Sequence, residues 1–417
     1  MRDLQTDYIV SACLPAHVSG SSCPLACMSE MKVSGSRIVR DLRAKVICSL
    51  KITPPNLHPL FPGSWSPGDT KSLEPLSPHP LSSLTMKTPQ KQRLEVIGAY
   101  QYVVTFLFMG LSCTLLVFFL HFTGLWSFSV LYFVWLYLDW NTPIQGGRHS
   151  RWMRKWTIWK HQRDYFPIKL LKMPELPADR NYVLGAHPHR IMSTGIFCNF
   201  PTDSNAFSQV FPRLRPWVAT LAGLFYLPDL PLYRDHLMFN GLCPVSRQSL
   251  DFILSQPQLG QAVTILIGGT QEVLYAVPGE HCITLRTRKG FVRLVLRHGA
   301  SLVPVYSFGE NDICRIKSFD QNSWQRRCQI AFKRLTGFSP CIFWGCSLFS
   351  ANLWGLVPFA QPITTVVGRP IPVPQSLKPT EDQVDCYHWL YMKALERLFA
   401  DHKEACGVPA STHLTFL

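Results

Sequence analysis

Charged residues are scarce in this chain of 417 residues. Asp, Glu, Lys and Arg together make up 16% of it, whereas an average soluble protein carries about 25%. Acidic residues are the scarcer kind, with 26 against 41 lysines and arginines, so the net charge is +15. The shortage of charge favours a protein that contacts lipid. The basic excess suits an anionic membrane face or a phosphate-bearing ligand.

Several short motifs of known chemistry are also missing. The Gly-x-Ser-x-Gly signature is absent, which argues against a serine hydrolase, and no Rossmann or P-loop glycine pattern occurs. Zinc-finger spacing and an arginine-rich arm are lacking, so we expect no nucleic-acid partner. Without a helical HExxH we expect no metal, and no cofactor that stays bound. The fourteen cysteines form no CxxC pair, which favours reduced thiols.

One long segment, residues 96–138, contains no charged residue at all. A single helix of that length would measure about 65 Å, whereas about 20 residues suffice to cross a bilayer. A polar break at residues 121–124 predicts a transmembrane or re-entrant hairpin, with arms near Tyr102–Leu120 and Leu125–Leu138. Lysines and arginines flank both ends, which predicts that both termini face the cytosol. A buried helix pair in a soluble protein is the alternative.

The hairpin separates two regions of different composition. Residues 1–86 include eight prolines between Pro54 and Pro80 and show no regular period, so we predict a disordered extension. Residues 140–417 are mixed in composition and alternate between strand-like and helical patterns, which predicts an α/β domain. The strand-like runs are Tyr182–Leu184, Ala262–Ile267, Leu302–Tyr306 and Ile363–Val367, and the clearest helical periods are Lys289–His298 and Tyr387–His402.

Two histidines, His187 and His189, follow the first strand-like run. Gly185 and Pro188 break regular structure there, so both imidazoles are expected on a loop at the end of a buried strand. An imidazole can take a proton from a hydroxyl near neutral pH and turn it into a nucleophile. The two histidines are therefore candidate general bases, and a pair of ordinary surface histidines is the alternative.

A second strand-like run ends in Gly268-Gly269, and Glu272 follows three residues later. Glycines let a backbone approach a ligand closely, and their amides can face an oxyanion. A carboxylate such as Glu272 can orient a catalytic imidazole and stabilise its cation. An ordinary turn is the alternative. Glu310 and Asp312 follow a third run and either line the same pocket or cap a turn.

Basic residues gather at the start of the helical period near residue 290. Lys289, Arg293 and Arg297 are spaced by four and share one helical face, and Arg288 precedes them. A basic stripe at a loop-to-helix junction suits the phosphates of coenzyme A. A solvated face, or a contact with anionic lipid headgroups, is the alternative.

Taken in order, these segments closely resemble the diacylglycerol acyltransferase-2 family, and most nearly its monoacylglycerol acyltransferases. The resemblance runs from about Gln90 to the end of the chain. The segments that carry it are Gly98–Tyr102, Asp139–Pro143, His187–His189, Cys243–Arg247, Arg288–Val292, Tyr306–Asp312, Trp354–Phe359 and Pro362–Gly368.

The resemblance implies a multi-pass protein of the endoplasmic reticulum membrane that converts monoacylglycerol to diacylglycerol, with diacylglycerol as a further acceptor. Acyl-CoA would be the co-substrate and the lipid bilayer a partner, and the chain would form a homo-oligomer or a hetero-oligomer with other acyltransferases. His189, or His187, would take the proton of the acceptor hydroxyl as it attacks the thioester. Glu272 would orient the imidazole. Arg288, Lys289, Arg293 and Arg297 would hold the phosphates of acyl-CoA.

One residue departs from the family pattern beside the histidines. The family has Gly after His-Pro-His, whereas this chain has Arg190. A neighbouring cation is expected to lower the pKa of His189, and the bulk of the side chain could obstruct the acceptor. Two alternatives therefore stay open: a catalytically impaired homologue that binds lipid or a partner protein, and a wax-alcohol acyltransferase that acts on long-chain alcohols.

Overall fold

The computed structural model describes residues 88–226, 232–273, 279–317, 319–320, 323–336, 340–348 and 354–417. Of these, the residues from Leu94 to Leu417 belong to one compact unit. The extension predicted over residues 1–86 lies outside the described residues.

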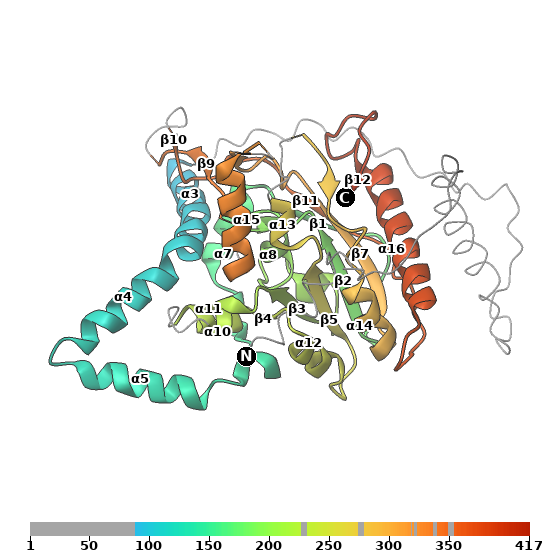
Figure 1. The fold of residues 1–417 in the computed structure, drawn as a ribbon. Helices are drawn as coiled ribbons and strands as arrows, with labels where there is room; N and C mark the ends of the chain where they lie inside the picture. Colours follow the sequence, from blue (N-terminus) through green and yellow to red (C-terminus); the bar gives the residue numbers. More distant parts are fainter. Residues whose placement is uncertain are drawn as a thin grey trace, which may run out of the picture. The chain divides into compact units, whose positions relative to one another are not determined.

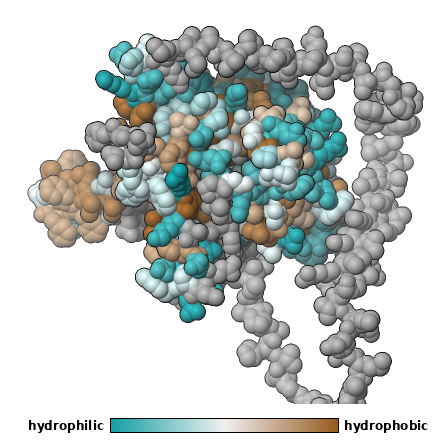
Figure 2. Space-filling model, turned by 90° about the horizontal axis from the view of Figure 1, so that it is seen from above, coloured by the Kyte–Doolittle hydropathy of each residue, from teal (hydrophilic) through white to brown (hydrophobic). Residues whose placement is uncertain are grey.

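The apolar segment folds into helices that extend away from the sheet (Figure 1). Helix α3 (Pro89–Val104) continues through a π-helical turn, η1 (Thr105–Met109), into α4 (Gly110–His121), and α5 (Trp126–Leu138) returns after the polar break. Ser129 on α5 donates a hydrogen bond of 3.0 Å to the Val117 carbonyl on α4. Large apolar side chains on both arms are exposed, and Figure 2 shows a hydrophobic lobe there.

By length and composition, the continuous helix Pro89–His121 could cross a membrane, and α5 is a shorter apolar helix. Only 11% of the most apolar window of the longer helix is buried, which differs from the buried helix pair of a soluble protein. Insertion of the hairpin into a bilayer stays a prediction.

A seven-stranded sheet forms the centre of the domain, in the order β1-β11-β7-β2-β5-β3-β4. Every neighbouring pair is parallel except β11 and β7. The four predicted strands are present, so the α/β class is confirmed. The strands are β1 (Lys169–Lys172), β2 (Tyr182–His187), β3 (Arg215–Thr220), β4 (Leu242–Pro244), β5 (Gln261–Leu266), β7 (Ser301–Phe308) and β11 (Thr364–Val367).

Helices cover both faces of this sheet. Val183 of β2 packs in one apolar cluster, with residues of α12 (Arg247–Leu254), α14 (Gly290–His298) and α16 (Glu381–His402). Its neighbours Tyr182 and Leu184 pack in the other, with residues of α7 (Thr157–Tyr165), α8 (Thr194–Asn199) and α11 (Tyr233–Phe239). This alternation is expected of a strand buried on both sides.

Both predicted helices are present. Helix α16 begins at Glu381, whereas the helical period in the sequence begins at Tyr387. Thr380 caps its first turn, and Gln383 completes a capping box, which stabilises a helix start.

The remaining elements are η2 (Thr142–Gln145), α6 (Arg151–Arg154), α7 (Thr157–Tyr165), α8 (Thr194–Asn199), α9 (Phe207–Val210), α10 (Gly223–Tyr226), α11 (Tyr233–Phe239), β6 (Cys282–Ile283), α13 (Gly269–Glu272), β8 (Arg315–Ile316), α15 (Trp324–Thr336), β9 (Phe343–Cys346), β10 (Trp354–Gly355) and β12 (Thr415–Phe416).

Among the residues that the structure describes, the cysteines follow the sequence expectation except for Cys386. Those that the structure describes as free include the buried Cys198, Cys243 and Cys314. Cys386 on α16 is disulfide-bonded, so the expectation of reduced thiols is wrong for this residue.

Candidate active site

The first candidate base, His187, is the last residue of β2 and is fully buried. Its Nε2 lies 3.0 Å from the Tyr391 hydroxyl, which donates its own proton to the Gly185 carbonyl at 2.9 Å. The Nε2 must therefore carry the proton of the histidine–tyrosine bond. Burial lowers the pKa of His187 to about 3. This imidazole is neutral at pH 7, and its Nε2 forms a hydrogen bond with Tyr391 on α16.

Only glycine fits at position 185 in this arrangement. A Cβ there would overlap the Tyr391 hydroxyl and crowd Ile267. The glycine inside the strand thus marks the close approach of a side chain from α16.

The second candidate, His189, is half-buried and borders a pocket. Burial lowers its pKa to about 4, and the charges of Arg190 and Arg288 act in the same direction. The expected effect of Arg190 is therefore present, although burial is the larger cause. The imidazole of His189 is neutral at pH 7, in the form that can accept a proton.

Glu272 reaches the histidine loop from the end of α13. Its Oε1 accepts a hydrogen bond of 2.6 Å from the backbone N–H of His189, and its Oε2 accepts one of 2.9 Å from the N–H of Thr284. We expected this carboxylate to contact an imidazole, and the structure instead brings it to the backbone of the loop. Burial raises its pKa to about 7, opposed by these two hydrogen bonds and by nearby arginines.

Glycine at position 268 makes room for this carboxylate. A Cβ on Gly268 would overlap both Oε2 and Cδ of Glu272. The Gly-Gly pair that suggested a ligand-binding turn is therefore needed, at its first position, for the packing of Glu272.

A second buried carboxylate, Glu310, holds the other end of the loop. Its two oxygens accept hydrogen bonds from the N–H groups of Thr194 and Gly195 at 2.6 and 2.8 Å. These are the first residues of α8, where unpaired N–H groups and the helix dipole favour a negative charge. Burial raises the pKa of Glu310 to about 7. The sequence left open whether Glu310 lines the pocket or caps a turn. These hydrogen bonds favour a capping role, at the start of α8.

Arg190 is buried, with 4% of its surface exposed. Its side chain borders a small cavity of about 10 Å³ together with Glu310 and Asn311. The described lining of the larger pocket at His189 does not include Arg190. The side chain of Arg190 therefore does not line this pocket, and obstruction of the acceptor stays a prediction. The negative charges of Glu272 and Glu310 both act on its guanidinium.

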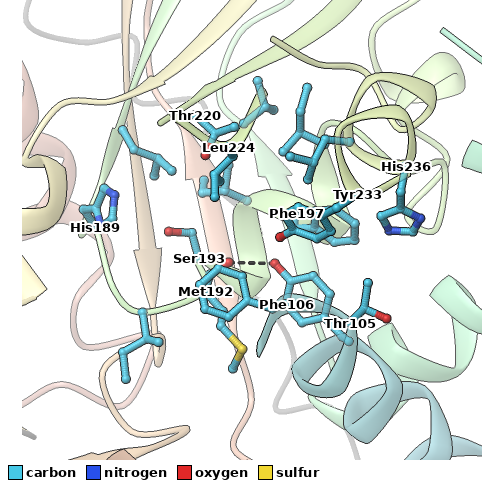
Figure 3. A pocket seen from close by; sticks show the side chains of 17 residues that line it. Thr105, Phe106, His189, Met192, Ser193, Phe197, Thr220, Leu224, Tyr233 and His236 are labelled. Atoms are coloured by element: carbon cyan, nitrogen blue, oxygen red, sulfur yellow. Dashed lines mark hydrogen bonds between the residues drawn. The ribbon is translucent and has the colours of Figure 1, made fainter. Parts of the chain in front are cut away.

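The pocket at His189 has a volume of about 100 Å³ and is mostly apolar. Figure 3 shows His189 at one end and His236 of α11 at the other, with Phe106 and Phe197 between them. The first apolar helix forms part of the wall, and the Tyr102 hydroxyl on α3 donates a hydrogen bond of 2.7 Å to the Met192 carbonyl. The pocket thus joins the candidate base to the helix predicted to enter the membrane.

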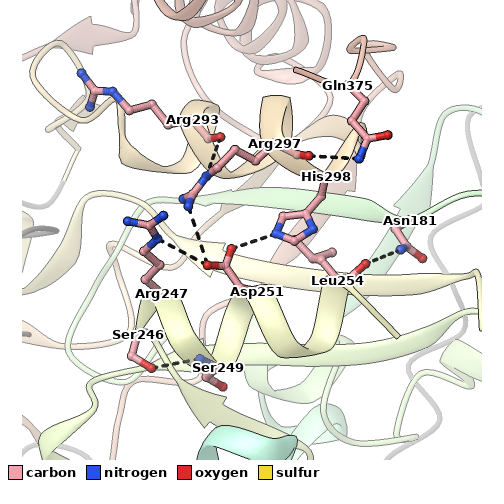
Figure 4. A network of polar contacts seen from close by, with 10 residues as sticks. All are labelled: Asn181, Ser246, Arg247, Ser249, Asp251, Leu254, Arg293, Arg297, His298 and Gln375. Atoms are coloured by element: carbon pink, nitrogen blue, oxygen red, sulfur yellow. Dashed lines mark hydrogen bonds and ion pairs between the residues drawn. The ribbon is translucent and has the colours of Figure 1, made fainter. Parts of the chain in front are cut away.

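The basic stripe on α14 is already paired with acidic residues. Arg293 lies 2.8 Å from Glu381, and Lys289 pairs with Asp385, both acids on α16. Arg297 and His298 approach Asp251 on α12, at 3.7 and 2.8 Å (Figure 4).

Arg288 differs from Lys289, Arg293 and Arg297, the three residues of the basic stripe on α14. Its guanidinium is half-buried, and Nε has no hydrogen-bond partner within the described part of the chain. Its charge acts on both Glu272 and His189. Of the four residues expected to bind phosphate, Arg288 is one whose charge lowers the pKa of the candidate base His189.

The sequence did not indicate Tyr391 or His236, which lie far along the chain from the histidine loop. The glycine at 185 was the one local signal for the first, because a glycine inside a strand marks a close approach. For His236 we find no local signal, since it belongs to a short helix without a motif.

Residues 118–417 match the diacylglycerol acyltransferase family. The chain is 71% identical over 333 residues to human 2-acylglycerol O-acyltransferase 3, covering 80% of this chain and 97% of that protein. It is 49% identical over 319 residues to human diacylglycerol O-acyltransferase 2, covering 76% and 81%. The crystal structure of the 1-acyl-sn-glycerophosphate acyltransferase PlsC from Thermotoga maritima aligns with a TM-score of 0.34 at 12% identity, over 75% of this chain and 98% of that one.

Proposed function

The chain belongs to the diacylglycerol acyltransferase family and is an O-acyltransferase, and from this premise we propose that it transfers a fatty acyl group from acyl-CoA to a free hydroxyl of monoacylglycerol. One observation carries the choice of a lipid acceptor: His189 opens onto an apolar pocket whose wall includes residues of the first apolar helix. The relative that shares 71% identity is named for acylation of 2-acylglycerol, which supports the same acceptor.

In the proposed reaction the acceptor hydroxyl attacks the thioester carbonyl of acyl-CoA directly. His189 takes the hydroxyl proton as the new C–O bond forms. When the tetrahedral intermediate collapses, the C–S bond breaks, and the imidazolium returns the proton to the leaving thiolate. The products are diacylglycerol and free CoA, so atoms and charges balance without a covalent enzyme intermediate.

The two glutamates have a positioning role in this proposal. Glu272 fixes the backbone at His189, and Glu310 fixes the start of α8, so the imidazole stays at one end of the pocket. A negative charge at Glu272 also stabilises the imidazolium that forms during the reaction. Backbone amides near Gly268 are candidate donors to the oxyanion.

We further propose that the enzyme works in the endoplasmic reticulum membrane, with the α4–α5 hairpin inserted and both termini in the cytosol. The exposed apolar side chains of the hairpin support insertion, and the basic residues on both of its flanks support the orientation.

The test uses microsomes that contain the full chain, radiolabelled palmitoyl-CoA and three acceptors: monoacylglycerol, diacylglycerol and a long-chain alcohol. We expect label in diacylglycerol from the first acceptor. His189→Ala should reduce the rate by about 100-fold or more, while His413→Ala, at an exposed position, should leave it unchanged. Unchanged transfer by His189→Ala at equal expression would exclude it as the base. Label only in the ester of the alcohol would favour a wax-alcohol acyltransferase, and no label at all an impaired homologue.

A further inference from the structure

The second apolar helix, α5, ends at a buried acid that has no part in the proposed reaction. This acid, Asp139, begins one of the segments that carry the family resemblance. Arg234 of α11 donates two hydrogen bonds to it from the same Nη2, one of 2.7 Å to Oδ2 and one of 2.8 Å to the backbone carbonyl. The two side chains are 2% and 8% exposed for Arg234 and Asp139. A single guanidinium therefore joins α11 to the end of the hairpin, away from water.

A second arginine makes the same connection from a more exposed position. Arg148 pairs with Asp139 and, at 3.1 Å, with Asp235 of α11. Both guanidinium groups also lie over the ring of Trp135, at 5.5 Å for Arg148 and 6.0 Å for Arg234, which is within the range of a cation–π contact. Trp135 precedes Asp139 by four residues, so the two share a face of α5. These five residues form the α5–α11 cluster.

Helix α11 is also a wall of the pocket at His189. Tyr233, His236 and Leu237 line that pocket, and they stand directly beside Arg234 and Asp235 in the sequence of the same short helix (Figure 3). Each of the two acid–base links of α11 therefore lies next to a pocket residue. A movement of α11 relative to α5 would change the shape of the pocket.

We propose that Asp139 and Arg234 are positioning residues for the acceptor: their pair holds α11 at the end of the hairpin and thereby sets the shape of the pocket at His189. The inference rests on the proposed function, in which this pocket receives monoacylglycerol. The described lining of the pocket includes neither residue, so both act through Tyr233, His236 and Leu237 rather than by contact with the substrate.

A purely structural role for the pair would have a different kinetic effect. Loss of folded protein lowers the maximal rate and leaves the KM values unchanged, whereas a displaced pocket wall weakens the binding of the acceptor. The KM for monoacylglycerol therefore separates the two roles.

The experiment measures initial rates with the full-length protein in neutral detergent micelles, varying monoacylglycerol and palmitoyl-CoA in turn. Arg234→Gln and Asp139→Asn should each raise the KM for monoacylglycerol by about tenfold, as expected for residues that act on a site without touching its ligand. The KM for palmitoyl-CoA should stay within about twofold. The double variant should be no worse than either single one, because all three lack the same pair. Arg148→Gln, at a side chain that is 36% exposed, should have a smaller effect.

Lys403→Gln is the matched control for the loss of a buried cation. Lys403 is 7% exposed, and its Nζ donates hydrogen bonds to the carbonyls of Ala410 and Thr412. It does not line the described pocket. This substitution should lower the Tm and leave both KM values unchanged.

Hydrogen exchange of backbone amides provides a readout that does not depend on turnover. Exchange at residues 233–239 should become faster in Arg234→Gln, since local protection reflects local stability, while exchange in β7 stays unchanged. If Arg234→Gln does not fold, Asp139→Asn carries the same test, because asparagine keeps an oxygen that can accept the Thr142 hydroxyl.

An unchanged KM for monoacylglycerol in the variants that fold would overturn the proposal, as would an equal rise in both KM values or the same rise in Lys403→Gln. Faster exchange at α11 in preparations where even the wild type transfers no acyl group would instead contradict the proposed function and leave the link between α5 and α11 standing.

Discussion

The loop between β2 and α8 and the basic face of α14 both hold charged side chains against neighbouring elements, but in different ways. In the loop, two buried carboxylates accept backbone N–H groups at residues 189, 194 and 195. On α14, cations pair with carboxylates that are themselves partly exposed. The first arrangement fixes the shape of a backbone segment, whereas exposed pairs contribute little to stability. Substitutions in the two regions should therefore differ steeply in effect.

The largest effect is expected for Gly268→Ala. The added Cβ would overlap the Glu272 carboxylate, which must then leave the N–H groups of His189 and Thr284. Unpaired buried N–H groups and a displaced charge should destabilise the fold by about 3 kcal/mol and reduce acyl transfer by about 100-fold. Urea unfolding and the microsomal assay measure the two losses.

Gly223→Ala is the matched control for that substitution. Position 223 has open space around a Cβ, so both stability and activity should stay close to the wild type. If Gly268→Ala behaves like this control, the loop does not depend on Glu272.

The next largest effect is a dependence of stability on pH. The pKa of His187 is about 3 when folded and about 6.5 when unfolded. The unfolded chain thus binds more protons between these values, so this contribution is complete above about pH 6.5 and is lost as the pH falls toward 3. At pH 5 the loss from His187 alone is about 2 kcal/mol. His187→Asn should flatten the decline in Tm between pH 7 and pH 5. Parallel declines in the two proteins would contradict the assignment.

A smaller effect is expected for Arg190→Gly. Its charge lowers the pKa of both Glu272 and Glu310, so its removal should raise each above 7. A smaller fraction of each carboxylate is then ionised at pH 7 than in the wild type. We expect activity at pH 7 to fall about fivefold and to recover toward higher pH. A sharp gain in activity would instead support obstruction of the acceptor by Arg190.

The smallest effect is expected on α14. Arg293→Gln breaks a pair in which Arg293 is 38% and Glu381 69% exposed, so the free energy of unfolding should change by less than about 1 kcal/mol. The measurement is a urea titration of Arg293→Gln and, in parallel, of Gly268→Ala. A loss as large as that of Gly268→Ala would remove the contrast between the two regions.

Local pattern was sufficient for much of the fold. Apolar runs predicted β2, β5, β7 and β11, and helical periods predicted α14 and most of α16, because burial imposes a period on each element. The same period predicted a shared face for Lys289, Arg293 and Arg297. It could not predict that this face meets acids on α12 and α16, since Glu381 is 88 residues from Arg293.

The sequence singled out residues that the structure brings together, but it did not predict the contacts that they make. The histidine pair, Glu272 and Glu310 all lie around one loop, yet both carboxylates bind backbone rather than an imidazole. Side-chain direction at a turn depends on neighbours such as Gly268, whose missing Cβ has meaning only once Glu272 is folded beside it. Likewise, periodicity does not tell which face of α15 is inward, because Arg326 is buried and Trp324 is exposed, the reverse of what burial of apolar residues predicts.

The hydrogen bond from Tyr102 to the Met192 carbonyl has a practical consequence for making the protein. The apolar helices look like a detachable anchor that could be cut away to obtain a water-soluble enzyme for crystallography. A cut after Leu138, at the end of α5, would also remove Tyr102, Thr105 and Phe106, all of which line the pocket at His189. It would leave a carbonyl of the loop without its donor. Shortened versions should therefore keep the chain from about residue 94 onward and be handled in lipid from the start.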